Sequence, residues 1–254
     1  MTTVRSSSLV LLLVAAPAFA DDTDTGVEKP TNDAATTVDA GDFVPLGVSP
    51  KTPSSHAQMV GGYDTARGGA VVETKVEAKL HDRFEIMVAG RYEGPTGMLE
   101  PRITGQLGIL DEKKQRLDLS VSGGWERQGF NGVPAVTARI AAGHHIGDAY
   151  VAGSTAMGFG INDNERYGEL TLSGLGHVAP HVYAGLDARG RLDLQHDTDP
   201  STEDAWAVQA GPVASVAAGP VAVTGFAGVS ARRQHTVATD DIGAITMLGL
   251  GAVF

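Results

Sequence analysis

Residues 70–80 read AVVETKVEAKL, and this stretch alternates strictly between two kinds of side chain. Val72, Val76 and Leu80 fall on one parity, whereas the acids and lysines at positions 73, 75, 77 and 79 fall on the other. A period of two places the two sets on opposite faces of one β-strand. Residues 81–83 then lead into a second alternating stretch at 84–94, so the sequence predicts a β-hairpin here.

The same alternation continues to the end of the chain and predicts about twelve strands in all. Short turns alternate with longer, more polar loops, as in a transmembrane up-and-down antiparallel β-barrel whose short turns are periplasmic. An even number of strands leaves both ends of such a barrel on the same side. Besides 70–80 and 84–94, the predicted strands are 56–66, 100–111, 116–129, 133–146, 149–160, 165–179, 181–195, 205–219, 221–234 and 243–254.

Charge separates the two faces of these strands. One parity carries no Lys, Arg or Glu within the strand interiors, and the other carries eight acids and eight bases. A soluble β-sandwich also segregates its faces, so this pattern alone leaves both folds open. The charges predicted to line a lumen are Glu73, Lys75, Glu77, Lys79, Glu85, Arg91, Arg102, Asp118, Glu126, Arg139, Glu169, Asp187, Arg189, Arg191, Asp193 and Arg232.

Aromatic residues favour the membrane barrel over the sandwich, because they gather at the strand ends, where a ring has one wet and one dry side. Phe226 lies in the middle of a strand, and Tyr150, Tyr167 and Tyr183 fall on the inward parity. The predicted strands, at about 10 to 15 residues, are also longer than usual soluble strands and long enough to cross a bilayer. The predicted aromatic girdle consists of Phe84, Tyr92, Trp125, Phe159, Trp206 and Phe254.

The first 55 residues have a different composition. Residues 1–20 predict a signal peptide, with Arg5 before an apolar stretch and Ala18-Phe19-Ala20 at the cleavage site. Residues 21–55 are rich in Asp, Thr, Ala and Pro and predict a disordered acidic periplasmic linker ahead of a barrel at 56–254. The apolar island at 43–48 leaves open a second interpretation, in which it docks on a partner or plugs the lumen.

Composition excludes several classes of protein. The chain of 254 residues contains no cysteine, which rules out disulfide scaffolds and Cys-ligated zinc modules. Its net charge of −11 argues against nucleic acid as a partner, because phosphate binding depends mainly on Lys and Arg. Beyond residue 20 it has no apolar run long enough for a transmembrane helix.

The C-terminus alternates to a terminal phenylalanine, with Leu248, Gly249, Leu250 and Phe254 as its main elements. In this feature and in its alternation the chain resembles the outer-membrane β-barrels of Gram-negative bacteria, with a porin-like architecture over residues 56–254. Ala252 and Met247 depart from the residues usual at their positions. The resemblance implies a location in the cell outer membrane, contact with its lipids and lipopolysaccharide, and folding by the barrel assembly machinery. It implies no cofactor.

Three functions remain open on the sequence alone. The first is a small passive channel for small polar solutes, whose lumen charges orient them. Equal numbers of acids and bases give this channel no predicted ion preference. The second is a closed structural or interaction barrel with acidic surface loops, formed by residues 197–204 and the Asp240-Asp241 pair.

The third is a lipid-modifying hydrolase, which is the least favoured of the three. Six histidines fall at the predicted short-turn end, and imidazole serves as a base or a metal ligand: His56, His81, His144, His145, His177 and His181. Their spacing matches no hydrolase or zinc motif, and no GxSxG or HExxH sequence is present. The sequence therefore predicts no enzyme, no catalytic residue and no metal site.

Overall fold

The computed structural model describes residue 50 and residues 55–94, 98–128, 133–161, 165–195, 204–235 and 239–254. Within these ranges the chain forms twelve β-strands and one short helix. They are β1 (His56–Asp64), β2 (Gly69–His81), β3 (Phe84–Glu93), β4 (Met98–Leu110), α1 (Glu112–Gln115), β5 (Asp118–Gln128), β6 (Val133–Ile146), β7 (Ala149–Gly160), β8 (Arg166–Ala179), β9 (Val182–Gln195), β10 (Asp204–Ala218), β11 (Val221–Gln234) and β12 (Asp241–Val253).

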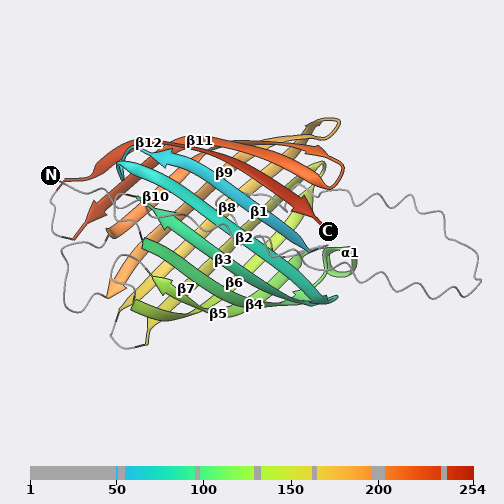
Figure 1. Ribbon diagram of the computed structural model, residues 1–254. Helices are drawn as coiled ribbons and strands as arrows, with labels where there is room; N and C mark the ends of the chain where they lie inside the picture. Colours follow the sequence, from blue (N-terminus) through green and yellow to red (C-terminus); the bar gives the residue numbers. More distant parts are fainter. Residues whose placement is uncertain are drawn as a thin grey trace, which may run out of the picture. The chain divides into compact units, whose positions relative to one another are not determined.

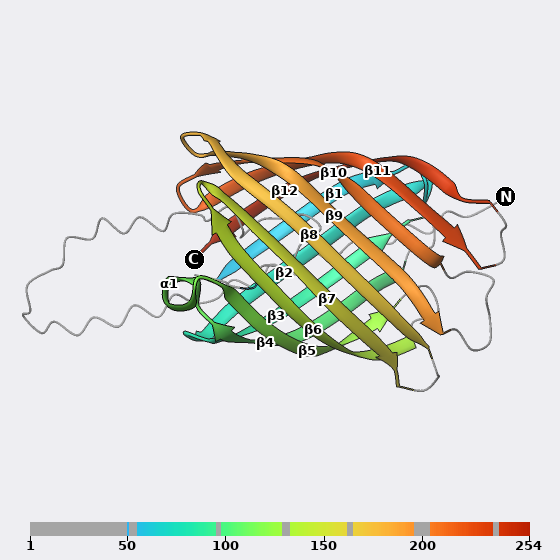
Figure 2. The same cartoon turned by 180° about the vertical axis from the view of Figure 1, so that it is seen from behind.

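Each strand pairs antiparallel with its neighbours in sequence, and β1 pairs with β12, so the sheet closes on itself (Figures 1 and 2). The closing ladder runs from His56 opposite Val253 to Asp64 opposite Ile245. Closure leaves no free edge, which is what a sheet needs in hydrocarbon, where unpaired backbone groups are costly. The predicted all-β, up-and-down antiparallel barrel of twelve strands is therefore confirmed.

The predicted strand bounds agree closely with the structure, and those of β6, β7 and β11 coincide with it. Two local details differ. The first strand ends at Asp64 rather than at residue 66, because the Asp64 carboxylate accepts the N–H groups of Ala66 and Arg67 and so forms the turn. The turn predicted at 112–115 contains α1, which begins where the Asp111 side chain accepts the Lys113 N–H.

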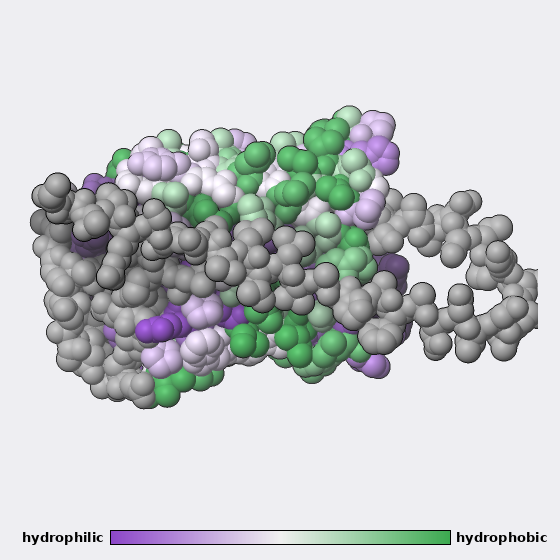
Figure 3. Space-filling view, in the orientation of Figure 1, coloured by the Kyte–Doolittle hydropathy of each residue, from purple (hydrophilic) through white to green (hydrophobic). Residues whose placement is uncertain are grey.

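Apolar side chains of one parity form the outer surface of the barrel. Val76, Leu170 and Leu186 are 47%, 52% and 67% exposed, respectively. On the face seen in Figure 3, apolar residues form patches mainly in the right half of the barrel. In a β-sandwich these side chains would pack against a second sheet, but here the single sheet closes and leaves them outside. This arrangement excludes the soluble sandwich.

The residues of the predicted aromatic girdle lie on the same outer surface. Phe84, Tyr92, Trp125, Phe159 and Phe254 are exposed, and Trp206 is half-buried. Tyrosines on the other parity point inward: the Tyr150 and Tyr167 side chains are buried, and Tyr183 is half-buried. The outer rings stand near strand ends, where a bilayer meets water.

Pro212 lies in the middle of β10, a position for which the sequence predicts a bulge or a wrong strand boundary. The structure shows neither. Pro212 pairs with Leu186 of β9, and the register with β11 is the same before and after it, from Ala210 opposite Val229 to Val213 opposite Phe226. The ladder to β11 simply skips two residues, because proline has no N–H to donate.

Most of the first 55 residues, including the predicted signal peptide (1–20) and the apolar island at 43–48, lie outside the described ranges. Pro50 is buried, and its Cγ lies 2.8 Å from the position that a Cβ on Gly143 of β6 would occupy. Ser55 accepts the N–H groups of Lys79 at 3.1 Å and Phe254 at 2.9 Å. Among the described residues, no helix is long and apolar enough to cross a membrane.

Candidate functional site

The candidate site is the inner wall of the barrel, whose enclosed space we call the lumen. All sixteen charged residues that the alternation assigns to a lumen are buried or half-buried, whereas the apolar residues that alternate with them are largely exposed. Charges from different strands meet on this wall, and most of them form ion pairs. The site therefore depends on how the barrel places residues that are distant in sequence.

Glu169 of β8 lies at the centre of the best-paired group. Its Oε1 lies 2.6 Å from Arg139 Nη2 of β6, and its Oε2 lies 2.5 Å from Arg189 Nη2 and 2.9 Å from Arg189 Nε of β9. Arg139 also donates to the Ser154 hydroxyl at 2.7 Å, which lies 2.7 Å from the Thr171 hydroxyl. Both carboxylate oxygens of Glu169 are thus occupied by arginines.

A second group forms around Glu126 of β5. Its Oε2 lies 3.0 Å from Arg102 Nε of β4, and its Oε1 accepts a short hydrogen bond from the Tyr167 hydroxyl of β8. Tyr167 reaches β5 by lying across Gly158 of β7, where a Cβ would come within 1.8 Å of the ring. The Arg191 guanidinium of β9 lies over the same ring, 4.3 Å from its centroid.

The wall formed by β2 and β3 carries alternating acids and bases. Lys75 Nζ lies 2.9 Å from Glu77 Oε1, and Arg91 Nη1 lies 3.6 Å from Glu73 Oε2. Lys79 leans toward the short-turn end, where its Nζ lies 3.4 Å from Asp82. Of the remaining predicted acids on the inner parity, Glu85, Asp118 and Asp187 are buried, and Asp193 is half-buried.

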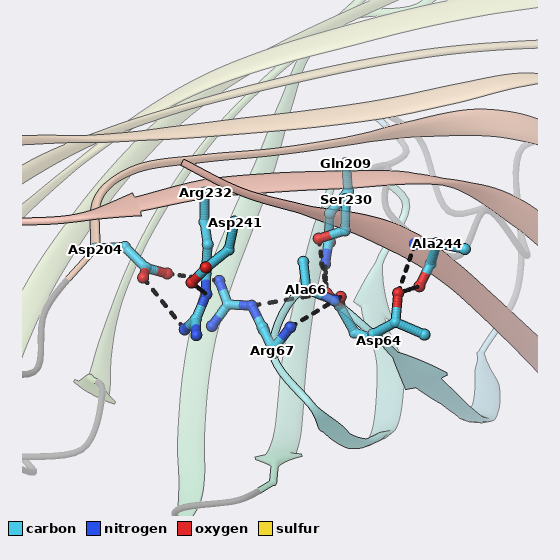
Figure 4. Close-up of polar contacts among 10 residues, drawn as sticks. Asp64, Ala66, Arg67, Asp204, Gln209, Ser230, Arg232, Asp241 and Ala244 are labelled. Carbon is cyan, nitrogen blue, oxygen red and sulfur yellow. Dashed lines mark hydrogen bonds and ion pairs between the residues drawn. The ribbon is translucent and has the colours of Figure 1, made fainter. Parts of the chain in front are cut away.

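Sequence analysis missed a polar network at the loop end (Figure 4). The Asp64 side chain is 0% exposed and accepts hydrogen bonds from Ser230 at 2.7 Å and Gln209 at 3.2 Å, which tie the β1–β2 turn to β11 and β10. Arg67 Nη2 lies 2.9 Å from Asp204 Oδ2. A sequence signal was available, because Asp64 shares the inward parity of His56, Gln58 and Val60.

Two acids of the predicted acidic surface loops, Asp204 and Asp241, belong to this loop-end network. Arg232 of β11 lies 3.5 Å from Asp204 at the start of β10 and 3.4 Å from Asp241 at the start of β12. The Asp204 side chain is only 17% exposed and lies against arginines, whereas the Asp241 side chain stays 47% exposed, as expected for an acid in a solvated loop. The rest of the acidic loop, residues 197–203, lies outside the described ranges.

Part of the lumen wall is apolar, which sequence analysis also missed. Phe226 of β11 is buried in a cluster that points inward from β1, β8, β10, β11 and β12. These apolar residues share the inward parity of the lumen charges, so their place on the inner face was already visible in the alternation along each strand. The apolar cluster consists of Val60, Leu175, Val213, Phe226, Ile245 and Met247.

The histidines at the short-turn end make local contacts. Glu112 of α1 binds both neighbours in β6: its Oε1 lies 2.8 Å from His144 Nδ1, and its Oε2 lies 2.5 Å from His145 Nδ1. Burial alone would raise the pKa of Glu112. Hydrogen bonds from the His145 backbone and from both imidazoles outweigh that effect, so the pKa of Glu112 lies below its ordinary value.

The other short-turn histidines do not assemble a site with this pair. His56 lies 3.7 Å from Glu77, and the His177 ring tilts against Tyr183. Among the residues that the structure describes, no three His, Asp or Glu side chains are grouped so as to hold a metal ion. These contacts lend the lipid-hydrolase alternative no support.

Comparison with known proteins shows similarity in structure but not in sequence. No protein-family model and no curated protein matches the chain. The NanC porin aligns with a TM-score of 0.60 at 9% identity, over 78% of this chain and 100% of that protein. The KdgM porin aligns at 0.53 and 6% identity, over 78% and 99%. An outer membrane channel from Pseudomonas putida F1 aligns at 0.52 and 14% identity, over 86% and 100%. At these identities the likeness concerns the fold, which is the β-barrel of outer-membrane porins and channels.

Proposed function

We propose that this protein is a passive outer-membrane channel for small polar solutes. The observation that carries the proposal is the pairing of an apolar outer surface with a charged inner wall in one closed sheet. Charged side chains are costly next to hydrocarbon, so their concentration on the inner face marks that face as the watery one. The structural neighbours, whose names describe porins and channels, support the same proposal.

The sixteen inward charges then line the path of the solute. Side chains such as Lys75, Glu77 and Arg91 present charge at the wall, and charges of this kind orient and select solutes in pores. Small residues between them, among them Ala152, Ser154 and Ala156 of β7, limit how far the wall projects into the lumen. We infer that this wall holds water along much of its length.

The proposal includes a location and partners. Outer-membrane lipids would contact the exposed apolar band, and lipopolysaccharide would surround the loop end. The barrel assembly machinery would recognise the C-terminal strand, in which Leu248, Leu250 and Phe254 are 65%, 58% and 67% exposed and Gly249 alternates with them. Export by the predicted signal peptide at 1–20 is part of the same proposal.

A closed structural barrel is the second candidate, and two observations favour it. The apolar cluster around Phe226 projects into the lumen, and ion pairs neutralise most inward charges. Such a wall holds the strands together without any need for a solute. The two candidates differ in one measurable property, which is the passage of ions.

The test uses the full-length protein, purified in detergent and shown to be folded by heat-modifiable gel migration. We expect stepwise conductance when it inserts into a planar bilayer. Phe226→Ala should raise the single-channel conductance, because the side chain occupies the inner wall, whereas Phe159→Ala removes an exposed outer ring and should leave it unchanged. A folded barrel that inserts without conductance, in the wild type and in Phe226→Ala, overturns the channel and supports the closed barrel.

A further inference from the structure

Arg191 is the arginine of the lumen wall that lacks a carboxylate partner among the described residues. The other inward arginines each lie within ion-pair distance of an acid: Arg91 with Glu73, Arg102 with Glu126, Arg139 and Arg189 with Glu169, and Arg232 with Asp204 and Asp241. Arg191 instead contacts the ring of Tyr167. That contact stabilises the cation but supplies no oxygen to its five N–H donors.

The acids nearest to Arg191 along the wall are already engaged. Glu169 lies directly opposite Arg191 in the β8–β9 ladder, but its two oxygens are bound by Arg139 and Arg189. Asp193, two residues further along β9, lies 2.6 Å from His235 Nε2. On the other side, Arg191 pairs with Ala207 of β10, which offers no charge. The guanidinium therefore keeps donors available on the inner face, where it is only half-buried.

The inward charges balance over the whole lumen and also around Arg191, but they are not all paired. Eight acids and eight bases cancel over all the predicted strands. Around Glu169 and Glu126 four arginines meet two carboxylates, and Asp187 and Asp193 lie on the same face of β9, two residues from Arg189 and from Arg191 respectively. We call Arg102, Arg139, Arg189 and Arg191 the arginine cluster. Arg191 is the member of this cluster that makes no ion pair with a described residue, so its donors can meet an anion that passes this part of the wall.

The chemistry of the available group indicates its ligand. A guanidinium presents parallel N–H donors that match the two oxygens of a carboxylate or of a phosphate, and these charge-assisted bonds are stronger than neutral ones. The Tyr167 ring contacts Arg191 and holds it in place. Tyr167 is itself fixed by the hydrogen bond from its hydroxyl to Glu126 and by the packing of its ring over Gly158. The donor is thus positioned before any ligand arrives, which lowers the entropy cost of binding.

We propose that the arginine cluster is a binding subsite for the carboxylate or phosphate group of a small anionic solute, with Arg191 as the residue that contacts it. This inference rests on the proposed channel, whose solutes it narrows to anions. Saturable binding at the subsite slows the bound anion relative to chloride, so the anion reduces chloride current as its concentration rises.

Two measurements on the full-length folded protein test the proposal. Calorimetric titration in detergent uses inorganic phosphate and, separately, acetate as probes, and it requires no conductance. The chloride current across a planar bilayer, recorded at rising concentrations of phosphate, reports whether the bound anion slows chloride. We expect Arg191→Gln to weaken oxyanion binding by about tenfold, as for the loss of a charge-assisted hydrogen bond. Arg191→Lys keeps the positive charge but loses the two parallel N–H donors of the guanidinium, so this variant should bind the oxyanion with intermediate affinity.

Arg91→Gln is the matched control, because it removes the same charge and side chain from a lumen arginine that is paired with Glu73. Both variants must show heat-modifiable migration. If Arg191→Gln and Arg91→Gln then weaken oxyanion binding equally, binding depends on the total charge of the lumen, and the subsite is overturned. Absence of binding by both probes in the wild type would overturn it too. Binding that depends on Arg191 in a protein without conductance would support the subsite and refute only the channel.

Discussion

The position of the Tyr167 ring on the inner wall depends on a glycine, Gly158, in the neighbouring strand. Its ring lies over Gly158 of β7, its hydroxyl donates to Glu126 of β5, and its face carries the Arg191 guanidinium. A β-strand directs side chains away from its own sheet, so a ring can lie along the wall only where the neighbouring strand leaves space. Gly158 provides that space.

Gly158→Ala should therefore destabilise the barrel. The new Cβ would lie 1.8 Å from Tyr167 Cε1, so the ring must move and lose its contacts with Glu126 and Arg191. We expect a loss of about 1–3 kcal/mol in the free energy of unfolding, as for overpacked sites. Urea unfolding in lipid vesicles measures it. The control is Gly61→Ala on β1, where a Cβ meets nothing within 4 Å. Similar losses in both variants would show that Tyr167 does not depend on Gly158.

At the scale of elements, α1 is joined to β6 by one carboxylate that meets two histidines. Glu112 accepts the His145 N–H and contacts the imidazoles of His144 and His145, while its own N–H donates to Asp118 at 2.8 Å. These contacts fix α1, which connects β4 to β5, to the end of β6 next to the β6–β7 turn.

The stability contributed by Glu112 should depend on pH in one direction. Because the pKa of Glu112 is lower in the folded protein than its ordinary value of 4.5, the contribution is fully present above pH 4.5. It is lost as the pH falls through the folded pKa. We expect Glu112→Gln to be less stable than the wild type at pH 6, with the difference shrinking below about pH 4.5.

Unfolding curves of the wild type and Glu112→Gln at several pH values measure this difference. The control, Asp148→Asn in the β6–β7 turn, alters a nearby acid without touching the histidine contacts, and it should show a smaller dependence on pH. A stability difference for Glu112→Gln that stayed constant from pH 6 to pH 3 would contradict the assignment.

At the scale of the whole molecule, the outer apolar surface determines which solvent the barrel tolerates. Leu172, near the middle of β8, and Ile242, at the start of β12, are 54% and 72% exposed. Exposure on this scale is unfavourable in water and favourable in lipid. The barrel and its membrane therefore form one stable unit, and the position of a residue along the strand sets how much it depends on lipid.

Arginine substitutions at these two positions should have different effects. Leu172→Arg is expected to lower the free energy of unfolding in lipid by about 2–4 kcal/mol, the cost of arginine near the bilayer midplane. Ile242→Arg, close to the strand end, should cost about 0–1 kcal/mol. Reversible unfolding in vesicles of defined lipid composition measures both values. Equal costs would mean that depth in a bilayer does not govern this surface.

The sequence by itself determined the strands, their number, their approximate bounds and the face to which each residue belongs. Those properties follow from a period of two and from turn residues, which are local along the chain. It also located the sixteen charges, because the parity of a residue needs no knowledge of its neighbours across the sheet. The loop-end contacts of Asp64 and the apolar cluster were missed, although the parity of their residues was already visible.

Only the tertiary structure decided which inward residues meet. Arg139 and Glu169 are 30 positions apart, Tyr167 and Glu126 are 41 apart, and Asp64 and Ser230 are 166 apart. The register of the ladders and the closure of β1 on β12 bring such pairs together, and neither can be derived from alternation along single strands. For the same reason, counting charges gave a neutral lumen but did not show that Arg191 makes no ion pair with any acid among the described residues.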